Sequence, residues 1–411
     1  MRLPVLILSG AILAGLGACS SVPAHHPVPA SLSSQAVVTG YPADIRFWAD
    51  EAPDFADAII NERLEQYRAA HADYYRAHNA YPPLNYLAIS GGANDGAFGA
   101  GFLSGWAASG TRPDFEMVTG VSTGALTAPF VFIGPQYDEM LRRLYTNTST
   151  NGIFESSLFS VLQGFTGGLA VTDNSPLVKM IDDNITPVVM AAIAAEHKKG
   201  KRLFIATTNM EAQRGVIWDI GAIANSGNPD ALMLIRKIIL ASVSVPGIFE
   251  PVFIDVQVGG KHYDEIHADG GVVSQVFIYP LKLQRSVIDA FKRYQLDRRL
   301  YVLRNGKIVP QYQTQQLSVL GLTTRSFETF TKYQGLGDLY RLYLASQRDG
   351  VDFNLVYIPD SFEAESKQLF DPAYMSQLYD TGYAMGLHAD LAWEKKPPGL
   401  DYEVETAGQQ Q

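Results

Sequence analysis

The 411-residue sequence has one cysteine, Cys19, so it cannot form an internal disulfide and its hydrophobic core must hold the fold. Charged residues make up only 18% and hydrophobic residues 47%, a balance typical of a globular protein rather than a disordered or coiled-coil one. The net charge is -10 and no lysine- or arginine-rich block is present, which argues against a nucleic-acid partner and against attraction to anionic lipid by charge alone. No histidine pair has the H-E-x-x-H spacing, so we expect no zinc site and no cofactor.

The N-terminus has the features of a targeting segment. Arg2 precedes a short apolar run, Leu3 to Leu16, which is too short to span a bilayer comfortably. The run ends in Leu-Gly-Ala-Cys19, which resembles the lipobox of bacterial lipoproteins. This resemblance implies that residues 1–18 are a signal peptide and that lipidated Cys19 anchors the protein to the cell envelope. Ser20, in place of Asp, favours the outer membrane; the alternative is a plain signal peptide followed by an incidental cysteine.

The rest of the chain divides by composition. Residues 19–42 are rich in Ser, Pro and Ala and predict a flexible tether. Residues 43–83, with Phe47, Trp48 and Phe55 among their apolar positions, predict a helical segment. Residues 84–290 form a central α/β segment, residues 291–394 an extension packed on it, and residues 395–411 a polar tail.

The central segment alternates short apolar strands with helices. The predicted strands are Tyr86–Ile89, Phe115–Thr119, Leu203–Thr208 and Val216–Ile220, and the predicted helices are Gly96–Ala108, Thr123–Ile133 and Asp230–Ser242. Strand and helix in succession favour a three-layer α/β/α sandwich with a mainly parallel sheet. Later strands are expected at Leu300–Leu303 and Phe353–Ile358, and a late helix at Ala373–Trp393.

Ser122 is the candidate nucleophile. Gly120-Val121-Ser122-Thr123-Gly124 matches G-x-S-x-G and lies between a predicted strand and a predicted helix. A sharp turn in that context exposes a serine hydroxyl, and the flanking glycines give the backbone room. The alternative is an ordinary glycine-rich turn in which Ser122 caps the helix.

A glycine-rich loop, residues 90–96, follows the first central strand and opens a helix. It contains Gly91, Gly92, Ala93 and Gly96. Unpaired main-chain N–H groups at a helix start can bind a phosphate or an oxyanion. The loop matches neither G-x-G-x-x-G nor a Gly-Lys-Ser/Thr nucleotide loop.

Asp269-Gly270-Gly271 follows a polar strand-like run, His262 to His267. Alone it is no more than a turn signal, because Asp-Gly dipeptides are common in turns.

The three motifs, in this order and each after a strand, resemble those of the patatin-like phospholipases, from about Leu84 to about Pro280. The resemblance implies that Ser122 is the nucleophile and Asp269 its base, without a histidine, and that N–H groups of Gly91, Gly92 and Ala93 form the oxyanion hole. It implies a lipid acyl hydrolase, a phospholipase or esterase that acts through an acyl-enzyme on a lipid ester substrate at a membrane.

Two positions depart from the pattern of that family. Ala93 stands where a third glycine is usual, and Asp95 stands where a basic residue is usual. A carboxylate beside an oxyanion site opposes the developing negative charge unless it points away or is paired. These departures support an alternative function, a catalytically inactive envelope lipoprotein of the same fold that binds lipid or a partner.

Two further features leave alternatives open. His388 is the histidine late enough in the chain for a Ser-Asp-His triad, although it lies in a predicted helix. The apolar stretch Ser157–Leu169, with interspersed glycines, is either a lid that contacts lipid or ordinary core and loop packing.

Overall fold

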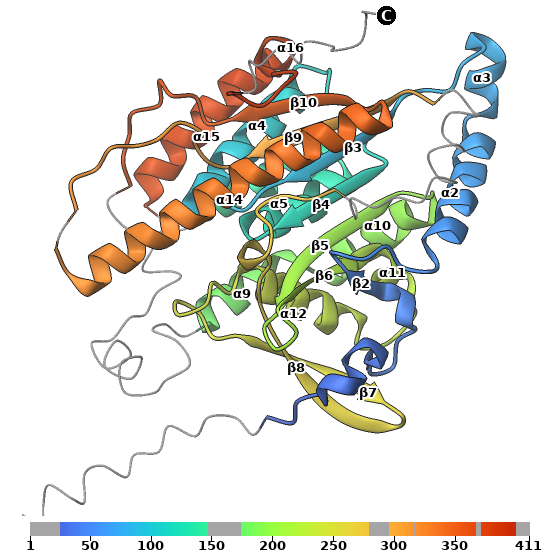
Figure 1. The fold of residues 1–411 in the computed structure, drawn as a ribbon. Coiled ribbons are helices and arrows are strands. Elements are labelled where there is room, and N and C mark those ends of the chain that lie inside the picture. Colours follow the sequence, from blue (N-terminus) through green and yellow to red (C-terminus); the bar gives the residue numbers. More distant parts are fainter. Residues whose placement is uncertain (1–24, 147–173, 279–295, 316, 367–370, 400–411) are drawn as a thin grey trace, which may run out of the picture.

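The computed structural model describes residues 25–146, 174–278, 296–315, 317–366 and 371–399 (Figure 1). Cys19 and the stretch Ser157–Leu169 lie outside these residues. Within the described ranges, no helix is long and apolar enough to cross a membrane.

The strands of the described residues form one mixed sheet of ten strands in the order β1-β7-β8-β5-β4-β3-β9-β10, with β6 beside β5 and β2 beside β6. The five strands β10, β9, β3, β4 and β5 are mutually parallel, and the strands beyond β5 are antiparallel to their neighbours. The α/β fold class is therefore confirmed, whereas the sheet is mixed and not mainly parallel as predicted, because every strand beyond β5 pairs antiparallel. The strands are β1 Val37–Val38, β2 Arg46–Trp48, β3 Leu84–Ile89, β4 Met117–Val121, β5 Arg202–Asn209, β6 Arg214–Asp219, β7 Val252–Val258, β8 Lys261–Asp269, β9 Arg298–Arg304 and β10 Asp352–Tyr357.

Helices cover both faces of the sheet because successive strand residues point to opposite faces. Leu87 and Ile89 of β3 face one apolar cluster with helices α4, α5, α10, α12 and α15, whereas Tyr86 and Ala88 face a second cluster with α2 and α14. The α-helices are α2 Ala56–Ala70, α3 Ala72–His78, α4 Gly96–Ala108, α5 Thr123–Ile133, α6 Asp138–Thr146, α9 Ser175–Asn184, α10 Pro187–Lys198, α11 Ile220–Asn225, α12 Ala231–Val243, α14 Val319–Asp349, α15 Pro372–Leu387 and α16 Ala389–Ala392. Short 3-10 helices are η1 Ala30–Gln35, η2 Ala43–Ile45, η3 Ala93–Asp95, η4 Pro135–Tyr137 and η5 Gly270–Val272.

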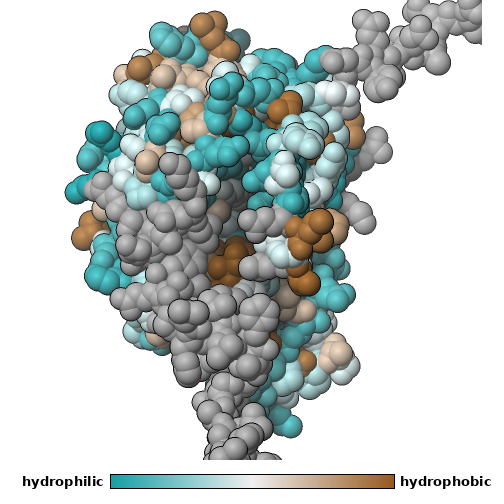
Figure 2. Space-filling view, turned by 90° about the vertical axis from the view of Figure 1, so that its left-hand side faces the viewer, coloured by the Kyte–Doolittle hydropathy of each residue, from teal (hydrophilic) through white to brown (hydrophobic). Residues whose placement is uncertain are grey.

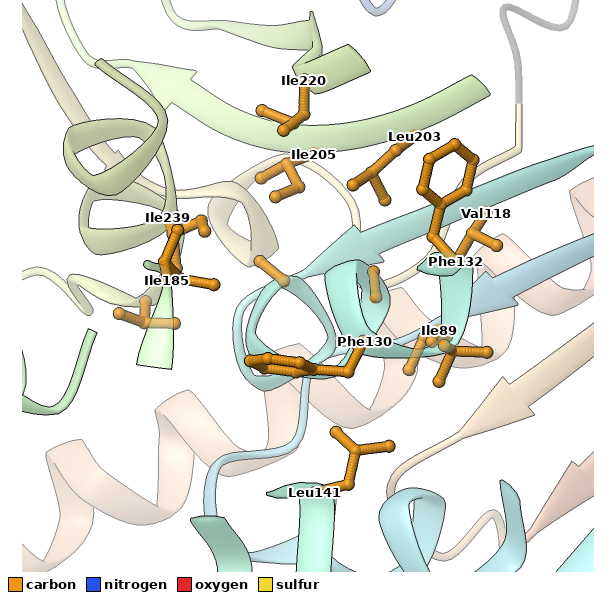
Figure 3. Packing of buried hydrophobic residues seen from close by; sticks show 14 of the residues in the cluster. Ile89, Val118, Phe130, Phe132, Leu141, Ile185, Leu203, Ile205, Ile220 and Ile239 are labelled. Atoms are coloured by element: carbon orange, nitrogen blue, oxygen red, sulfur yellow. The ribbon is translucent and has the colours of Figure 1, made fainter. Parts of the chain in front are cut away.

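The first cluster is the larger and holds α5 against the parallel strands. Figure 3 shows part of it, with side chains from α5 among those of β3, β4 and β5: Phe130, Phe132, Ile89, Val118, Leu203 and Ile205. This packing fixes the turn between β4 and α5, in which Ser122 lies.

The residues before Leu84 differ from the sequence-based expectation. Over its described part, the predicted tether is not a free chain: Val38 is buried and β1 pairs with β7. Phe47 and Trp48, predicted to be helical, lie in β2, which pairs with β6. The apolar spacing fits a helix locally, but a long-range pairing partner decides the conformation.

The predicted C-terminal extension is part of the sheet and not only packed on it. β9 pairs directly with β3, and β10 pairs with β9. Helix α15, which also belongs to this extension, lies against α4 on one face of the sheet. Glycines bring the backbones of these two helices into contact. A Cβ added at Gly101 would lie 2.0 Å from the carbonyl oxygen of Tyr379, and one at Gly386 would lie 2.2 Å from that of Phe102. Gly105 and Gly382 are equally restricted.

Candidate active site

Ser122 occupies the turn from β4 to α5, as the G-x-S-x-G motif predicts. Its φ of 53° and ψ of -125° are a strained conformation for a residue with a side chain, and such strain is concentrated at functional sites. The turn is tight: a Cβ at Gly120 would lie 2.4 Å from the carbonyl oxygen of Gly124, and one at Gly124 equally close to that of Ile89. The Ser122 N–H donates to Ser242 Oγ at 3.1 Å, which helps to hold the turn.

Asp269 ends β8 and lies beside Ser122, although 147 positions separate them in the numbering of the chain. The Ser122 side chain lies close enough to the Asp269 carboxylate to stabilise its ionised form as a hydrogen-bond donor, and the Gly271 N–H donates to Asp269 Oδ1 at 2.7 Å. Burial raises the pKa of Asp269 to about 7, against the opposing effect of these two donors. A carboxylate with this pKa can take a proton from the hydroxyl near neutral pH.

The Asp269 backbone is fixed from both sides. Its N–H donates to the Ser244 carbonyl at 2.9 Å, and its carbonyl accepts from Thr208 Oγ1 at 2.9 Å. Gly270 allows the close approach, since a Cβ there would lie 2.5 Å from the Ala206 carbonyl oxygen. These contacts position the carboxylate without a histidine.

The glycine-rich loop lies between β3 and α4, next to Ser122: a Cβ added at Gly91 would be 3.1 Å from Ser122 Cβ. The Gly91 N–H, however, already donates to the Gln275 carbonyl at 3.0 Å, so it is not one of the available donors and our prediction for Gly91 is corrected. Within the described part of the chain, the N–H groups of Gly92 and Ala93 have no acceptor at hydrogen-bond distance. Two of the three predicted donors are therefore available to an incoming oxyanion.

Ala93 has a φ of 47°, which the sequence did not indicate and which costs an alanine roughly 1 kcal/mol or more. Residue 92 must be a glycine, because a Cβ there would lie 2.2 Å from the Asn305 carbonyl oxygen. Gly96 allows the starts of α4 and α5 to meet, since its Cβ would lie 2.2 Å from Thr123 Oγ1.

Asn305, just after β9, was not predicted from the sequence and holds the loop in place. Its N–H donates to Ser90 Oγ at 2.8 Å, its Nδ2 donates to the Ser90 carbonyl at 2.9 Å, and its Oδ1 accepts from the Gly99 N–H at 3.1 Å. Asn305 is buried and comes from the C-terminal extension. No local motif marks it, because its role depends on the pairing of β9 with β3.

Asp95 is paired in the structure. Its Oδ1 accepts from the Tyr374 hydroxyl at 2.6 Å. Burial raises the Asp95 pKa to about 6, while the hydrogen bond from Tyr374 and the charges of Arg304 and Lys307 oppose this rise. The carboxyl that the sequence places beside the candidate oxyanion site thus has a hydrogen-bond donor and two nearby cations.

The histidines do not complete a triad with Ser122. His388 lies between α15 and α16, whereas Ser122 lies beside Asp269. His267 is buried, with its ring nitrogens on Thr207 Oγ1 at 2.8 Å and on Glu265 Oε2 at 3.1 Å. Among the residues that the structure describes, no group of His, Cys, Asp and Glu side chains could hold a metal ion.

Comparison with known proteins places this site in a known family domain. Residues 87–282 match the family model of patatin-like phospholipase, a segment that contains Ser122, Asp269 and the glycine-rich loop. This segment is therefore similar to patatin-like phospholipases. A comparison with curated protein sequences gives no significant match.

Three solved structures resemble the chain at low identity. VipD from Legionella pneumophila is 11% identical with a TM-score of 0.38, and the match covers 77% of this chain and 68% of that one. Human GIVD cytosolic phospholipase A2 is 10% identical with a TM-score of 0.33 and coverages of 78% and 56%. ExoU from Pseudomonas aeruginosa, solved in complex with SpcU, is 16% identical with a TM-score of 0.25 and coverages of 77% and 54%. The match spans little more than half of the last two proteins.

Proposed function

We propose that the protein is a lipid acyl hydrolase that uses Ser122 as nucleophile and Asp269 as general base. The observation that carries this proposal is a serine in a strained strand-to-helix turn that lies beside a buried carboxyl whose pKa is about 7. A base with a pKa near the working pH transfers protons efficiently. The match of residues 87–282 to patatin-like phospholipase supports a lipid ester as the substrate.

The proposed reaction proceeds in two halves. Asp269 takes the proton of Ser122 as Oγ attacks the ester carbonyl carbon, and the N–H groups of Gly92 and Ala93 stabilise the oxyanion. The ester C–O bond breaks, the alcohol or lysolipid leaves with the proton, and an acyl-enzyme remains. Water then attacks the acyl carbon and gives a proton to Asp269; the bond from that carbon to Ser122 Oγ breaks, Oγ takes the proton back from Asp269, and the fatty acid leaves. No step requires a cofactor.

Covalent labelling tests the proposal. A fluorophosphonate ester, offered to the folded protein in the presence of lipid, should form an adduct on Ser122 that peptide mass spectrometry locates. Because Asp269 must be ionised to act, the labelling rate should fall about tenfold for each pH unit below its pKa of about 7. A folded protein without an adduct on Ser122 would contradict the proposal and favour the alternative of a non-catalytic lipoprotein that binds lipid or a partner.

We also propose that the chain is anchored to the outer membrane of a bacterial envelope through lipidated Cys19. The support is the apolar run that ends in Leu16-Gly17-Ala18-Cys19, followed by Ser20. Intact mass measurement of protein extracted from membranes should give a chain that begins at Cys19 and carries acyl groups. A mature N-terminus elsewhere would contradict this anchor.

A further inference from the structure

The long helix α14 presents large apolar side chains to solvent. At 100° per residue they form one stripe opposite Leu339 and Leu342, which pack in the core beneath the helix. The members of this solvent stripe are Val319, Leu322, Phe330, Tyr333 and Leu344, and Phe330 is 73% exposed. A helix that is apolar on both sides normally has a partner on each, and none of the residues that the structure describes covers the solvent stripe.

The helix that carries the stripe is hydrogen-bonded to the candidate active site. Gln334 of α14 donates through Nε2 to the Val272 carbonyl at 3.2 Å and accepts from Gln275 Nε2 at 3.3 Å. Gln275 in turn donates to the Gly271 carbonyl at 2.9 Å, and its own carbonyl accepts from the Gly91 N–H. The middle of α14 is thus tied to both loops of the site, and its N-terminal half extends beyond the sheet on the same side (Figure 1).

Other exposed apolar residues lie just before the stripe in the sequence or beside the candidate active site. Tyr312 and Leu317 precede α14 and are almost fully exposed, and Val272 of η5 is 41% exposed next to the Asp269 loop. Figure 2, which views the molecule from this side, shows apolar residues on the surface. A lipid ester leaving a bilayer at this surface would have a short path to Ser122.

Positively charged side chains lie beside the solvent stripe. Arg325 and Lys332 lie on its flank in the N-terminal half of α14, and burial, the charge of Arg325 and the nearby Arg304 and Lys307 lower the pKa of Lys332. Glu328 and Asp360 are the exposed acidic groups that face these cations, while Asp95, bonded to Tyr374, and the buried Asp338 face the buried Arg304. Although the whole chain carries a net charge of -10, the charged groups at the surface beside the stripe are the cations Arg325, Lys332 and Lys307 and the two carboxylates Glu328 and Asp360. Apolar side chains flanked by cations are typical of helices that lie in the surface of an anionic bilayer.

We propose that the N-terminal half of α14 docks the protein on an anionic phospholipid bilayer, with the solvent stripe inserted between the lipid head groups. This inference rests on the proposed lipid hydrolase and specifies how its substrate is reached. A second copy of the chain fits the stripe less well, because it would place the same cations against one another.

Vesicle binding tests the docking surface separately from catalysis. The full-length chain carries Cys19→Ser, so that no lipid anchor contributes, and is mixed with vesicles of phosphatidylcholine and phosphatidylglycerol in equal parts. Replacing both Phe330 and Tyr333 with serine should weaken sedimentation with vesicles about tenfold or more, since two aromatic side chains no longer leave water. Val188→Ser is the matched control, because Val188 is 70% exposed on α10, on the opposite face of the sheet.

A second measurement does not depend on removing side chains. Because the chain has no cysteine besides Cys19, Leu322→Cys in the Cys19→Ser chain accepts a single environment-sensitive fluorophore. Its emission should shift to shorter wavelength on addition of vesicles, and that of the same label at Val188→Cys should not.

The outcomes separate the two proposals. Vesicle binding that the serine double variant leaves unchanged overturns the docking surface, and so does a dimer that this variant converts to a monomer. Weakened vesicle binding, with turnover of a water-soluble short-chain ester retained, supports it. A parent chain that binds vesicles through Phe330 and Tyr333 but hydrolyses no ester would contradict the hydrolase and still support the docking surface.

Discussion

Ser122→Ala should reduce ester hydrolysis by about 10⁴-fold or more, because in the proposed mechanism Ser122 Oγ forms the acyl-enzyme. The fold should be retained, because the Ser122 N–H, which donates to Ser242 Oγ, remains in the variant. Initial rates on a lipid ester and on a short-chain ester, with thermal unfolding in parallel, measure both effects.

Ser226→Ala is the matched control for that substitution. Ser226 Oγ donates to the Ile223 carbonyl at 2.7 Å at the end of α11, and its side chain is exposed. This variant should hydrolyse both esters at the parent rate. If Ser122→Ala kept more than a tenth of the parent rate, the nucleophile would have to be another group.

Asp269→Asn should reduce hydrolysis by about 10²- to 10⁴-fold and make the fold more stable at pH 8. The fold raises the Asp269 pKa from 3.8 to about 7, so it favours the protonated carboxyl. Stability from this group is fully present below pH 3.8 and is lost as the pH rises through 7. An asparagine cannot ionise, so the variant should gain roughly 4 kcal/mol over the parent at pH 8 and little at low pH.

Denaturant unfolding at pH 5 and pH 8, together with ester turnover, measures this prediction. Asp219→Asn is the matched control: Asp219 is also buried, but it accepts from the Ala222 N–H at 2.8 Å and lies 3.5 Å from Arg202 Nε. That variant should stay active, because the Asp219 carboxylate serves the start of α11 and Arg202 and not Ser122. An Asp269→Asn protein that is fully active, or less stable than the parent at pH 8, would contradict the proposed base.

The effects of substituting Ser122 and Asp269 on the rate of hydrolysis should not add. A protein with both Ser122→Ala and Asp269→Asn should be no slower than Ser122→Ala alone, since a base without its nucleophile contributes nothing to the covalent step.

The sequence predicted best the parts of the fold whose signals are local. Helices Gly96–Ala108 and Thr123–Ile133 have the predicted bounds, because each begins at a turn with small residues and continues as an apolar run. The approach of Ser122 to Asp269 was expected from the order of the three motifs. The structure brings the two side chains together.

The parts that the sequence could not predict depend on distant neighbours. That the Gly91 N–H donates to Gln275, and that Asn305 holds the loop through Ser90, follows only once β9 lies beside β3. The 31-residue α14 shows no clear helical period, because apolar side chains point both to the core and to solvent. Asp95 is hydrogen-bonded to Tyr374, which lies 279 positions later, and residue spacing in the sequence does not predict a contact over such a separation.

The close contact of α4 with α15, at Gly101, Gly105, Gly382 and Gly386, bears on how this protein can be dissected. The segment that matches the family model stops at residue 282, but the second half of this helix pair comes a hundred positions later. A fragment cut at that limit would expose the hydrogen-bonding edge of β3 and a glycine-lined groove on α4, both prone to aggregation. Recombinant versions meant for crystallisation or assay should therefore keep the chain through at least Leu387.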